Sequence, residues 1–191
     1  TVDVSHEGDF FSRFLSGVGI VGNVDVTDDD GGSVVIRGGR FVADSAIVFA
    51  DGNTGNAGQV DIKVSDTVQA SNGTLITADQ FGSGLPGQMT VEARRVVLES
   101  GGRLQVDNYG EGAGGKLTVT TTDSIDIEGR SAADLPVIGD QQGGLFAAAF
   151  GPGEGGDIKV STTDLDIGSE GKIELNAIAG AGNAGDLTVT A

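Results

Sequence analysis

The chain has 191 residues, of which 34 are glycine, nine are aromatic and none is cysteine. Its 28 acidic and 11 basic residues give a formal net charge of −17, which disfavours binding to nucleic acid or to anionic membranes. The lack of cysteine excludes disulfides, thiolate metal sites and cysteine nucleophiles, and no apolar run is long enough for a membrane-spanning helix. The apolar 38% is mostly Val, Ile, Leu and Ala, which suits a β-rich core.

The first 21 residues do not follow the pattern of the rest of the chain. The stretch "DFFSRFL" places four large apolar side chains on one helical face: Phe10, Phe11, Phe14 and Leu15. We predict that residues 1–21 are an irregular segment that covers the open end of a repetitive domain, which needs such protection. The alternative is that this segment packs against an upstream domain.

Residues 22–191 contain a repeat that glycine marks. The spacing G-x-G-x-x-G occurs in "FGSGLPG", "YGEGAGG", "FGPGEGG" and "AGAGNAG", and a degenerate copy, "GNTGNAG", precedes them. The last glycines of the series are Gly32, Gly58, Gly87, Gly115, Gly156 and Gly185, at intervals of 26, 29, 28, 41 and 29 residues. A period of this length indicates stacked units. The interval of 41 is one unit plus about 13 residues, which we assign to an inserted loop, "RSAADLPVIGDQQ", at 130–142.

Each glycine is followed by alternating apolar and polar residues. The second position after it is always apolar: Val34, Val60, Met89, Leu117, Ile158 and Leu187. The fourth is always β-branched: Ile36, Ile62, Val91, Val119, Val160 and Val189. Alternation with period two predicts a strand with one buried face. Two shorter strand-like segments follow in each unit, so the predicted fold is all-β, a parallel β-helix with rungs of three short strands and about 28 residues.

The glycine spacing does not indicate a nucleotide site. A dinucleotide-binding motif needs a helix after the glycines, whereas a strand follows every copy here. We interpret the glycines as tight corners where a side chain would collide with the neighbouring rung. The aromatic residues before three of the motifs, Phe81, Tyr109 and Phe150, fall in one column. They are predicted to stack and cap a corner of the core, with an exposed sugar-binding platform as the alternative.

The segments "GGSVVIRGGRFV", "NAGQVDIKVSDTV" and "GNAGDLTVT" resemble the repeats of filamentous-haemagglutinin-type exoproteins, the passengers of two-partner secretion. The resemblance covers roughly residues 32–191. It implies a right-handed, single-stranded parallel β-helix that is exported unfolded through an outer-membrane pore and acts in adhesion or surface structure. The secretion domain typical of that family is not in this sequence, so the export route is an expectation for a longer parent protein.

Catalytic and metal-binding patterns are weak. His6 is the only histidine, and no G-x-S-x-G elbow occurs. The outward columns after the glycines hold no repeated acid pair. Lys63 and Glu92 are predicted to form a cross-strand ion pair, and Arg94 and Arg95 to be solvated charges at a corner.

The acidic turn "TDDDGG" lacks the ligands of an EF-hand, because Gly32 and Gly39 stand where a third ligand and a glutamate are needed. We therefore predict that the chain is not an enzyme and that it has no cofactor and no metal site.

The predicted function is that of a non-catalytic solenoid segment in a large secreted or surface-attached bacterial exoprotein. It would serve as an adhesin shaft or a surface structural element, with a surface component of another cell or a polysaccharide as its partner. Candidate partner-binding residues lie in the inserted loop, the long excursion from a rigid scaffold: Asp134, Leu135, Pro136, Val137, Ile138 and Asp140. The alternative is that this apolar tuft covers the flank of the solenoid.

Two other functions remain open. One is a carbohydrate-active β-helix enzyme, which a cluster of at least three ionisable side chains around one sugar would favour. The other is a subunit that associates end to end in a filament.

Overall fold

The computed structural model describes residues 2–5, 17–20, 22–132, 142–178 and 183–191. Within these residues every regular element is a strand, and the strands form three parallel sheets. Sheet A contains β1 (Val2–Ser5), β4 (Ser33–Gly38), β7 (Gln59–Val64), β10 (Gln88–Ala93), β13 (Lys116–Thr121), β16 (Asp157–Ser161) and β19 (Leu187–Thr190). Sheet B contains β2 (Gly17–Ile20), β5 (Arg40–Asp44), β8 (Thr67–Ser71), β11 (Arg95–Glu99), β14 (Ser124–Glu128) and β17 (Asp164–Ile167). Sheet C contains β3 (Asn23–Asp25), β6 (Ile47–Phe49), β9 (Leu75–Thr77), β12 (Arg103–Gln105), β15 (Gly144–Phe146) and β18 (Lys172–Glu174).

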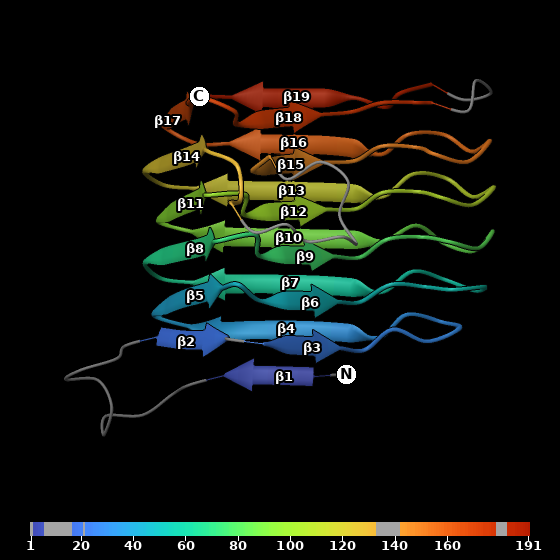
Figure 1. Ribbon diagram of the computed structural model, residues 1–191, viewed down its shortest axis with the longest axis horizontal. Helices are drawn as coiled ribbons and strands as arrows, with labels where there is room; N and C mark the ends of the chain where they lie inside the picture. Colours follow the sequence, from blue (N-terminus) through green and yellow to red (C-terminus); the bar gives the residue numbers. More distant parts are fainter. Residues whose placement is uncertain (1, 6–16, 21, 133–141, 179–182) are drawn as a thin grey trace.

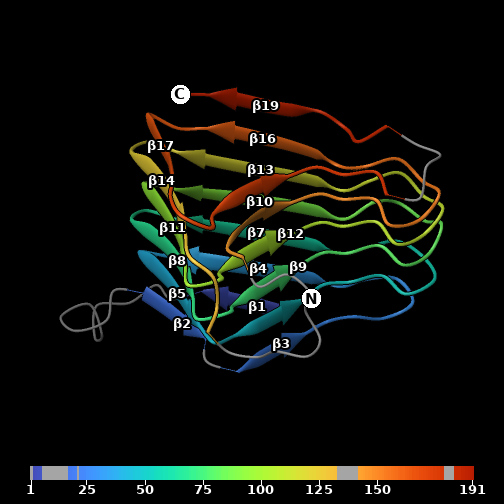
Figure 2. The same ribbon diagram turned by 45° about the horizontal axis from the view of Figure 1, so that its top comes forward.

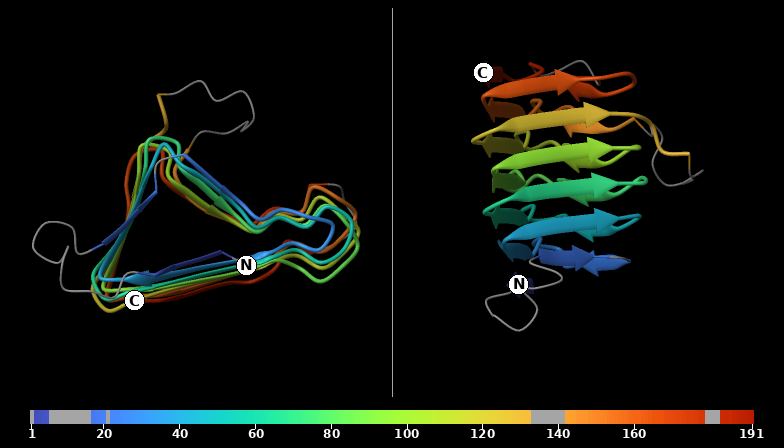
Figure 3. Two further views of the ribbon diagram at one scale, coloured as in Figure 1. Left: turned by 90° about the horizontal axis from the view of Figure 1, so that it is seen from below. Right: turned by 90° about the vertical axis from the view of Figure 1, so that its left-hand side faces the viewer.

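Each turn of the chain visits the three sheets in the same order and then passes to the next rung, as Figure 1 and Figure 2 show. Seen along the stack in Figure 3, the rungs superpose as a triangle with a narrow extension between sheet C and sheet A. The predicted all-β parallel solenoid with rungs about 28 residues apart is therefore confirmed.

The core follows the predicted register of sheet A. Val91 pairs with Ile62 on one side and Val119 on the other, and all three side chains have an exposed fraction of 0%. The inward residues of sheets B and C, such as Val96 and Leu104, complete the same apolar cluster. Because apolar side chains stack on apolar side chains of the next rung, each rung buries the apolar face of its neighbour.

The first residues of the chain also belong to the sheets, which differs from the prediction that the repeat begins at residue 22. Val2 pairs with Val34 in sheet A, and Gly17–Ile20 pairs with β5 in sheet B. These strands lack the glycine marker that identified the later units, so the sequence pattern did not reveal them. Residues 6–16, which include the predicted helical face and His6, lie outside the described residues.

The motif glycines allow two passes of the backbone to approach each other in the narrow extension. A Cβ atom on Gly87 would overlap the carbonyl oxygen of Ala78, and one on Gly58 would overlap that of Ala50. Both carbonyls belong to chain that is leaving sheet C, while both glycines lead into sheet A. The glycines are needed for close packing of backbone, as predicted, and no helix follows them.

No helix among the described residues is long and apolar enough to cross a membrane.

Candidate functional site

The outward side of sheet C, together with the start of the extension, lines a groove with a volume of about 460 Å³. This volume lies within the range of small-molecule sites. The groove crosses five successive strands of sheet C, from β6 to β18, so it runs along the stack. Its lining residues are Phe49, Asp51, Leu75, Thr77, Asp79, Phe81, Arg103, Gln105, Asp107, Tyr109, Phe146, Ala148, Phe150 and Glu174.

Parallel register brings these residues into columns. Thr77 pairs with Phe49 below and Gln105 above, and the register continues into the extension through the isolated bridges Gly52↔Gln80 and Gln80↔Asn108. Three aspartates therefore lie one above another, immediately before these bridges. We call Asp51, Asp79 and Asp107 the carboxyl column.

The three aromatic residues that follow the bridges form a second column, the ring column of Phe81, Tyr109 and Phe150. Neighbouring ring centroids are 4.8 Å apart and the ring planes differ by 8°, so the predicted stacking is confirmed. The prediction that the rings cap a corner of the core is wrong. They are 46%, 38% and 41% exposed and line the groove. Because they stack on one another, they cover most of one another's faces.

Each carboxyl of the carboxyl column binds the next rung. Asp51 Oδ1 accepts hydrogen bonds from the Thr77 hydroxyl and from the backbone N–H of Asp79, both at 2.7 Å. The two oxygens of Asp79 accept from the Asp107 backbone N–H and from the Gln105 side-chain amide, again at 2.7 Å. Asp107 Oδ1 accepts from the Ala148 backbone N–H at 2.7 Å. These bonds extend the backbone pairing with side-chain acceptors.

Burial makes these carboxyls reluctant to ionise. Loss of hydration raises the pKa of Asp79 well above its ordinary value, and the charges of Asp107 and Asp51 raise it further. Burial also raises the pKa of Asp107 to about 6, although the Ala148 N–H and the Arg103 charge oppose this shift. The pKa of Asp51 is raised too, again chiefly by burial. The environment of the groove therefore disfavours the ionised form of all three carboxyls.

Two carboxyl oxygens in the groove remain available to a ligand. No described residue donates a hydrogen bond to Oδ2 of Asp51 or of Asp107. The two residues are only 7% and 3% exposed, and both line the groove. A donor group of a ligand that reached these oxygens would add hydrogen bonds that no described residue supplies.

The positive charge in the groove comes from Arg103. Its guanidinium lies over the ring of Phe146, 3.9 Å from the centroid, and Nη2 donates to Gln105 Oε1 at 3.0 Å. Nearby, Lys172 forms a 2.9 Å ion pair with Glu174. Its ammonium also lies over the ring of Phe146, 6.0 Å from the centroid, so both cations on this aromatic face are side chains of the protein itself.

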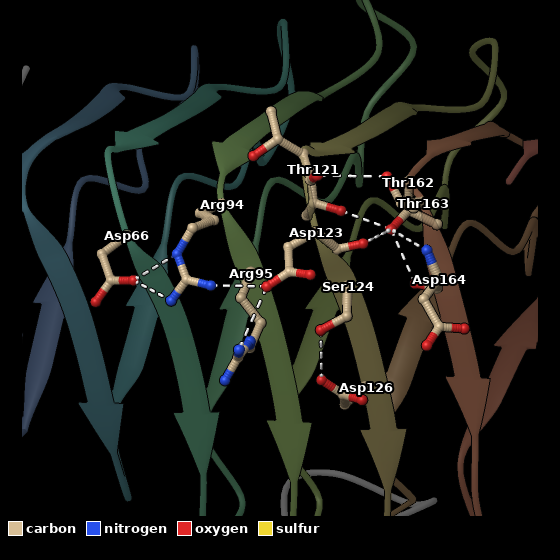
Figure 4. Close-up of polar contacts among 11 residues, drawn as sticks. Asp66, Arg94, Arg95, Thr121, Asp123, Ser124, Asp126, Thr162, Thr163 and Asp164 are labelled. Atoms are coloured by element: carbon tan, nitrogen blue, oxygen red, sulfur yellow. Dashed lines mark hydrogen bonds and ion pairs between the residues drawn. The ribbon is translucent and has the colours of Figure 1, made fainter.

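A second polar cluster lies at the corner between sheets A and B (Figure 4). Arg94 bridges two rungs, because Nη2 lies 2.6 Å from Asp66 and Nη1 lies 2.7 Å from Asp123. Arg95 also contacts Asp123, at 3.3 Å. Both arginines lie at this corner in contact with solvent, as predicted, and they are in addition paired with aspartates. The hydrogen bond to Arg94 holds the pKa of Asp66 below its ordinary value.

Buried threonines complete that corner. The hydroxyls of Thr121 and Thr162 are 2.7 Å apart, and Thr162 also donates to the backbone (Figure 4). These groups satisfy one another, so the corner joins successive rungs and offers little to a ligand.

The remaining predictions from sequence have mixed outcomes. Lys63 and Glu92 form the predicted ion pair, at 2.6 Å. The predicted insertion, residues 130–142, falls between β14 and β15, and Arg130 and Gln142 form an isolated antiparallel bridge. The candidate binding residues Asp134, Leu135, Pro136, Val137, Ile138 and Asp140 lie outside the described residues, so their role stays a prediction.

No metal site is evident in the described part of the chain, where no three His, Cys, Asp or Glu side chains are arranged to hold an ion. In the acidic turn, Asp30 Oδ1 accepts the backbone N–H of Asn56 at 2.8 Å, which is a structural role.

The sequence interpretation missed the carboxyl column. Asp51, Asp79 and Asp107 are separated by 28 residues each, so the signal was present. It was overlooked because the repeats were aligned on residues after the glycines, and these aspartates precede them.

Comparisons of this chain with protein-family models, with curated proteins and with solved structures find no significant match.

Proposed function

We propose that this chain is a non-catalytic solenoid segment of a large secreted or surface-attached bacterial exoprotein, serving as an adhesive shaft. The observation that carries this proposal is the uniform stacking of rungs, in which β1 to β19 keep one register along sheet A. Such a stack grows by one strand spacing, ~4.8 Å, with each unit, so it is suited to holding a contact surface at a distance.

The outward columns support the same proposal. Ion pairs join successive rungs at Lys63–Glu92 and at Arg94 with Asp66 and Asp123. Arg37 is likewise paired with Asp61. These contacts stiffen the flanks of the solenoid and leave the groove along sheet C as the surface suited to contact a partner.

The test is to remove one unit, residues 88–115, so that β7 meets β13 in the original register. A shaft predicts that the protein still unfolds cooperatively and that small-angle scattering shows a rod shortened by ~4.8 Å. Loss of the folded state in the shortened chain would contradict a modular shaft. The matched control duplicates the same unit and should lengthen the rod by the same amount.

A second candidate, a carbohydrate-active enzyme, is favoured by one observation. Asp51, Asp79 and Asp107 together with Arg103 and Glu174 form the kind of ionisable cluster that sugar chemistry requires. The proposal of a non-catalytic shaft stands against it, because Asp79 uses both carboxyl oxygens to hold the next rung. Release of reducing ends from a panel of polysaccharides, abolished by Asp107→Asn, would establish the enzyme instead.

A further inference from the structure

We infer that the groove on sheet C binds an uncharged glycan chain that lies along the solenoid axis. The inference deepens the proposed adhesive function, since it names the partner's chemistry. It rests on the shape of the groove, on its unpartnered hydrogen-bonding atoms and on its charges.

The shape favours a linear polymer. The groove crosses β6, β9, β12, β15 and β18, which are neighbours in one sheet, so it extends over roughly 19 Å at the spacing of parallel strands. Along it, the carboxyl column repeats over three successive rungs, and so does the ring column. A chain of repeating sugar units can make the corresponding contacts in sequence.

The unpartnered atoms favour hydroxyl groups. Oδ2 of Asp51 and Oδ2 of Asp107 accept hydrogen bonds when ionised, and a protonated carboxyl also donates. With its pKa raised to about 6, Asp107 changes between these two forms in mildly acidic solution. A hydroxyl can both donate and accept, so it satisfies either form of the carboxyl.

The apolar wall suits the C–H groups of a sugar. Tyr109 and Phe150 present half-exposed ring surface beside the carboxyl column, and Phe49 and Leu75 add apolar surface on the opposite side. Ligand sites commonly combine such apolar walls with a few polar groups that fix orientation.

The charges disfavour an anionic ligand, and the aromatic faces of the groove offer no place to a cationic one. A polyanion such as a uronic-acid polymer would meet the carboxyl column and Glu174 in a chain of net charge −17. A cationic ligand would seek an aromatic face, but the guanidinium of Arg103 already covers Phe146. The ring column stacks on itself and turns ring edges, which are the positive part of the quadrupole, toward its sides.

Isothermal titration calorimetry of the 191-residue chain with sugar hexamers tests the inference. The neutral probes are cellohexaose, maltohexaose and mannohexaose, the anionic probe is hexagalacturonate, and the cationic probe is the glucosamine hexamer. We expect at least one neutral hexamer to bind and to be recovered uncleaved. Binding of only the anionic or only the cationic hexamer, or of no neutral hexamer, would overturn the inference.

Variants then locate the site. Tyr109→Ala removes the middle ring of the ring column. Asp107→Asn keeps the oxygen that accepts from the Ala148 N–H and replaces the free oxygen with an amide nitrogen. Each variant should weaken glycan binding by about tenfold. Phe81→Ala, at the exposed end of the ring column, provides a second ring variant if Tyr109→Ala is poorly folded. The controls are Leu85→Ala, an exposed apolar residue that does not line the groove, and Asp126→Asn, on the outward side of sheet B.

Unchanged affinity in all three groove variants would contradict the assigned site. The shaft is judged separately by the length of the rod, so a failure of glycan binding does not become a failure of the proposed function.

Discussion

Two outward-facing surfaces of this solenoid differ although both come from strands with the same alternation. On sheet A the residues between the core positions, such as Thr90 and Thr118, are half-exposed. On sheet C the equivalent residues, such as Thr77 and Gln105, are buried. Alternation determines which residues point inward, but it does not determine whether the outward residues reach solvent.

The difference arises from the shape of the backbone beside each sheet. After sheet C the chain turns outward into the extension, as Figure 3 shows, whereas sheet A is followed by a tight corner into sheet B. The bend makes the outward side of sheet C concave, and the ring column stands beside it. Polar groups there lose water without entering the core, which is why their pKa values shift.

The largest effect is expected for a charge placed in the inward column. Val91→Asp would put an unpaired carboxylate between Ile62 and Val119, at a cost of about 4 kcal/mol in the free energy of unfolding. Thr118→Asp, on the outward side of the neighbouring strand, should change it by about 0.5 kcal/mol or less. Urea denaturation of both variants measures the contrast, and equal losses would mean that the register is wrong.

A methyl group in the extension should have the next largest effect. Gly87→Ala would force Cβ onto the Ala78 carbonyl oxygen, so we expect a loss of about 2–3 kcal/mol. Gly19→Ala is the matched control, because the nearest atom to its Cβ is 3.9 Å away. Thermal unfolding of the two variants gives the comparison. A tolerated Gly87→Ala would show that the two backbone passes are less close than described.

The carboxyl column should make the protein less stable as pH rises. A folded-state pKa of about 6 for Asp107 means that, between about pH 4 and pH 6, the folded chain keeps a proton that the unfolded chain has released. Stability therefore falls across this window and levels off above it. Asp107→Asn cannot ionise, so it should be roughly 2 kcal/mol more stable than the parent at pH 7.5 and equal to it near pH 4.

Urea unfolding at a series of pH values checks this prediction, and Asp126→Asn serves as the exposed-side control. The argument would be refuted if the parent protein became more stable from pH 4 to pH 6 and Asp107→Asn abolished that rise.

The smallest effect is expected on the flat outward side of sheet A. The Lys63–Glu92 pair spans two rungs at 2.6 Å, but both side chains are about half-exposed. Its coupling energy should lie at about 0.2–1 kcal/mol and decrease with added salt. A double-mutant cycle with Lys63→Ala and Glu92→Ala measures it. A coupling of several kcal/mol would indicate that sheet A, too, holds its outward groups away from water.

Much of the fold could be predicted because its information is local and repeated. The second and fourth residues after each motif glycine, from Val34 to Val189, identify the inward columns. The glycines themselves identify where two passes of the backbone approach each other. The strands at Val2–Ser5 and Gly17–Ile20 escaped notice because they carry no such marker. The groove could not be predicted from alternation, since the burial of Asp79 or Gln105 depends on how the extension bends, and no single repeat reveals that.

The most direct test of the central claim, that sheet C carries a buried polar groove, is an NMR titration of the side-chain carboxyl carbons. Comparison with Asp107→Asn assigns the signal of Asp107. The account predicts that this carboxyl titrates near pH 6, well above the carboxyl of Asp66, whose pKa is lowered by Arg94. An Asp107 carboxyl that titrates at the ordinary value of about 4 would show that the column is open to water and would contradict the account.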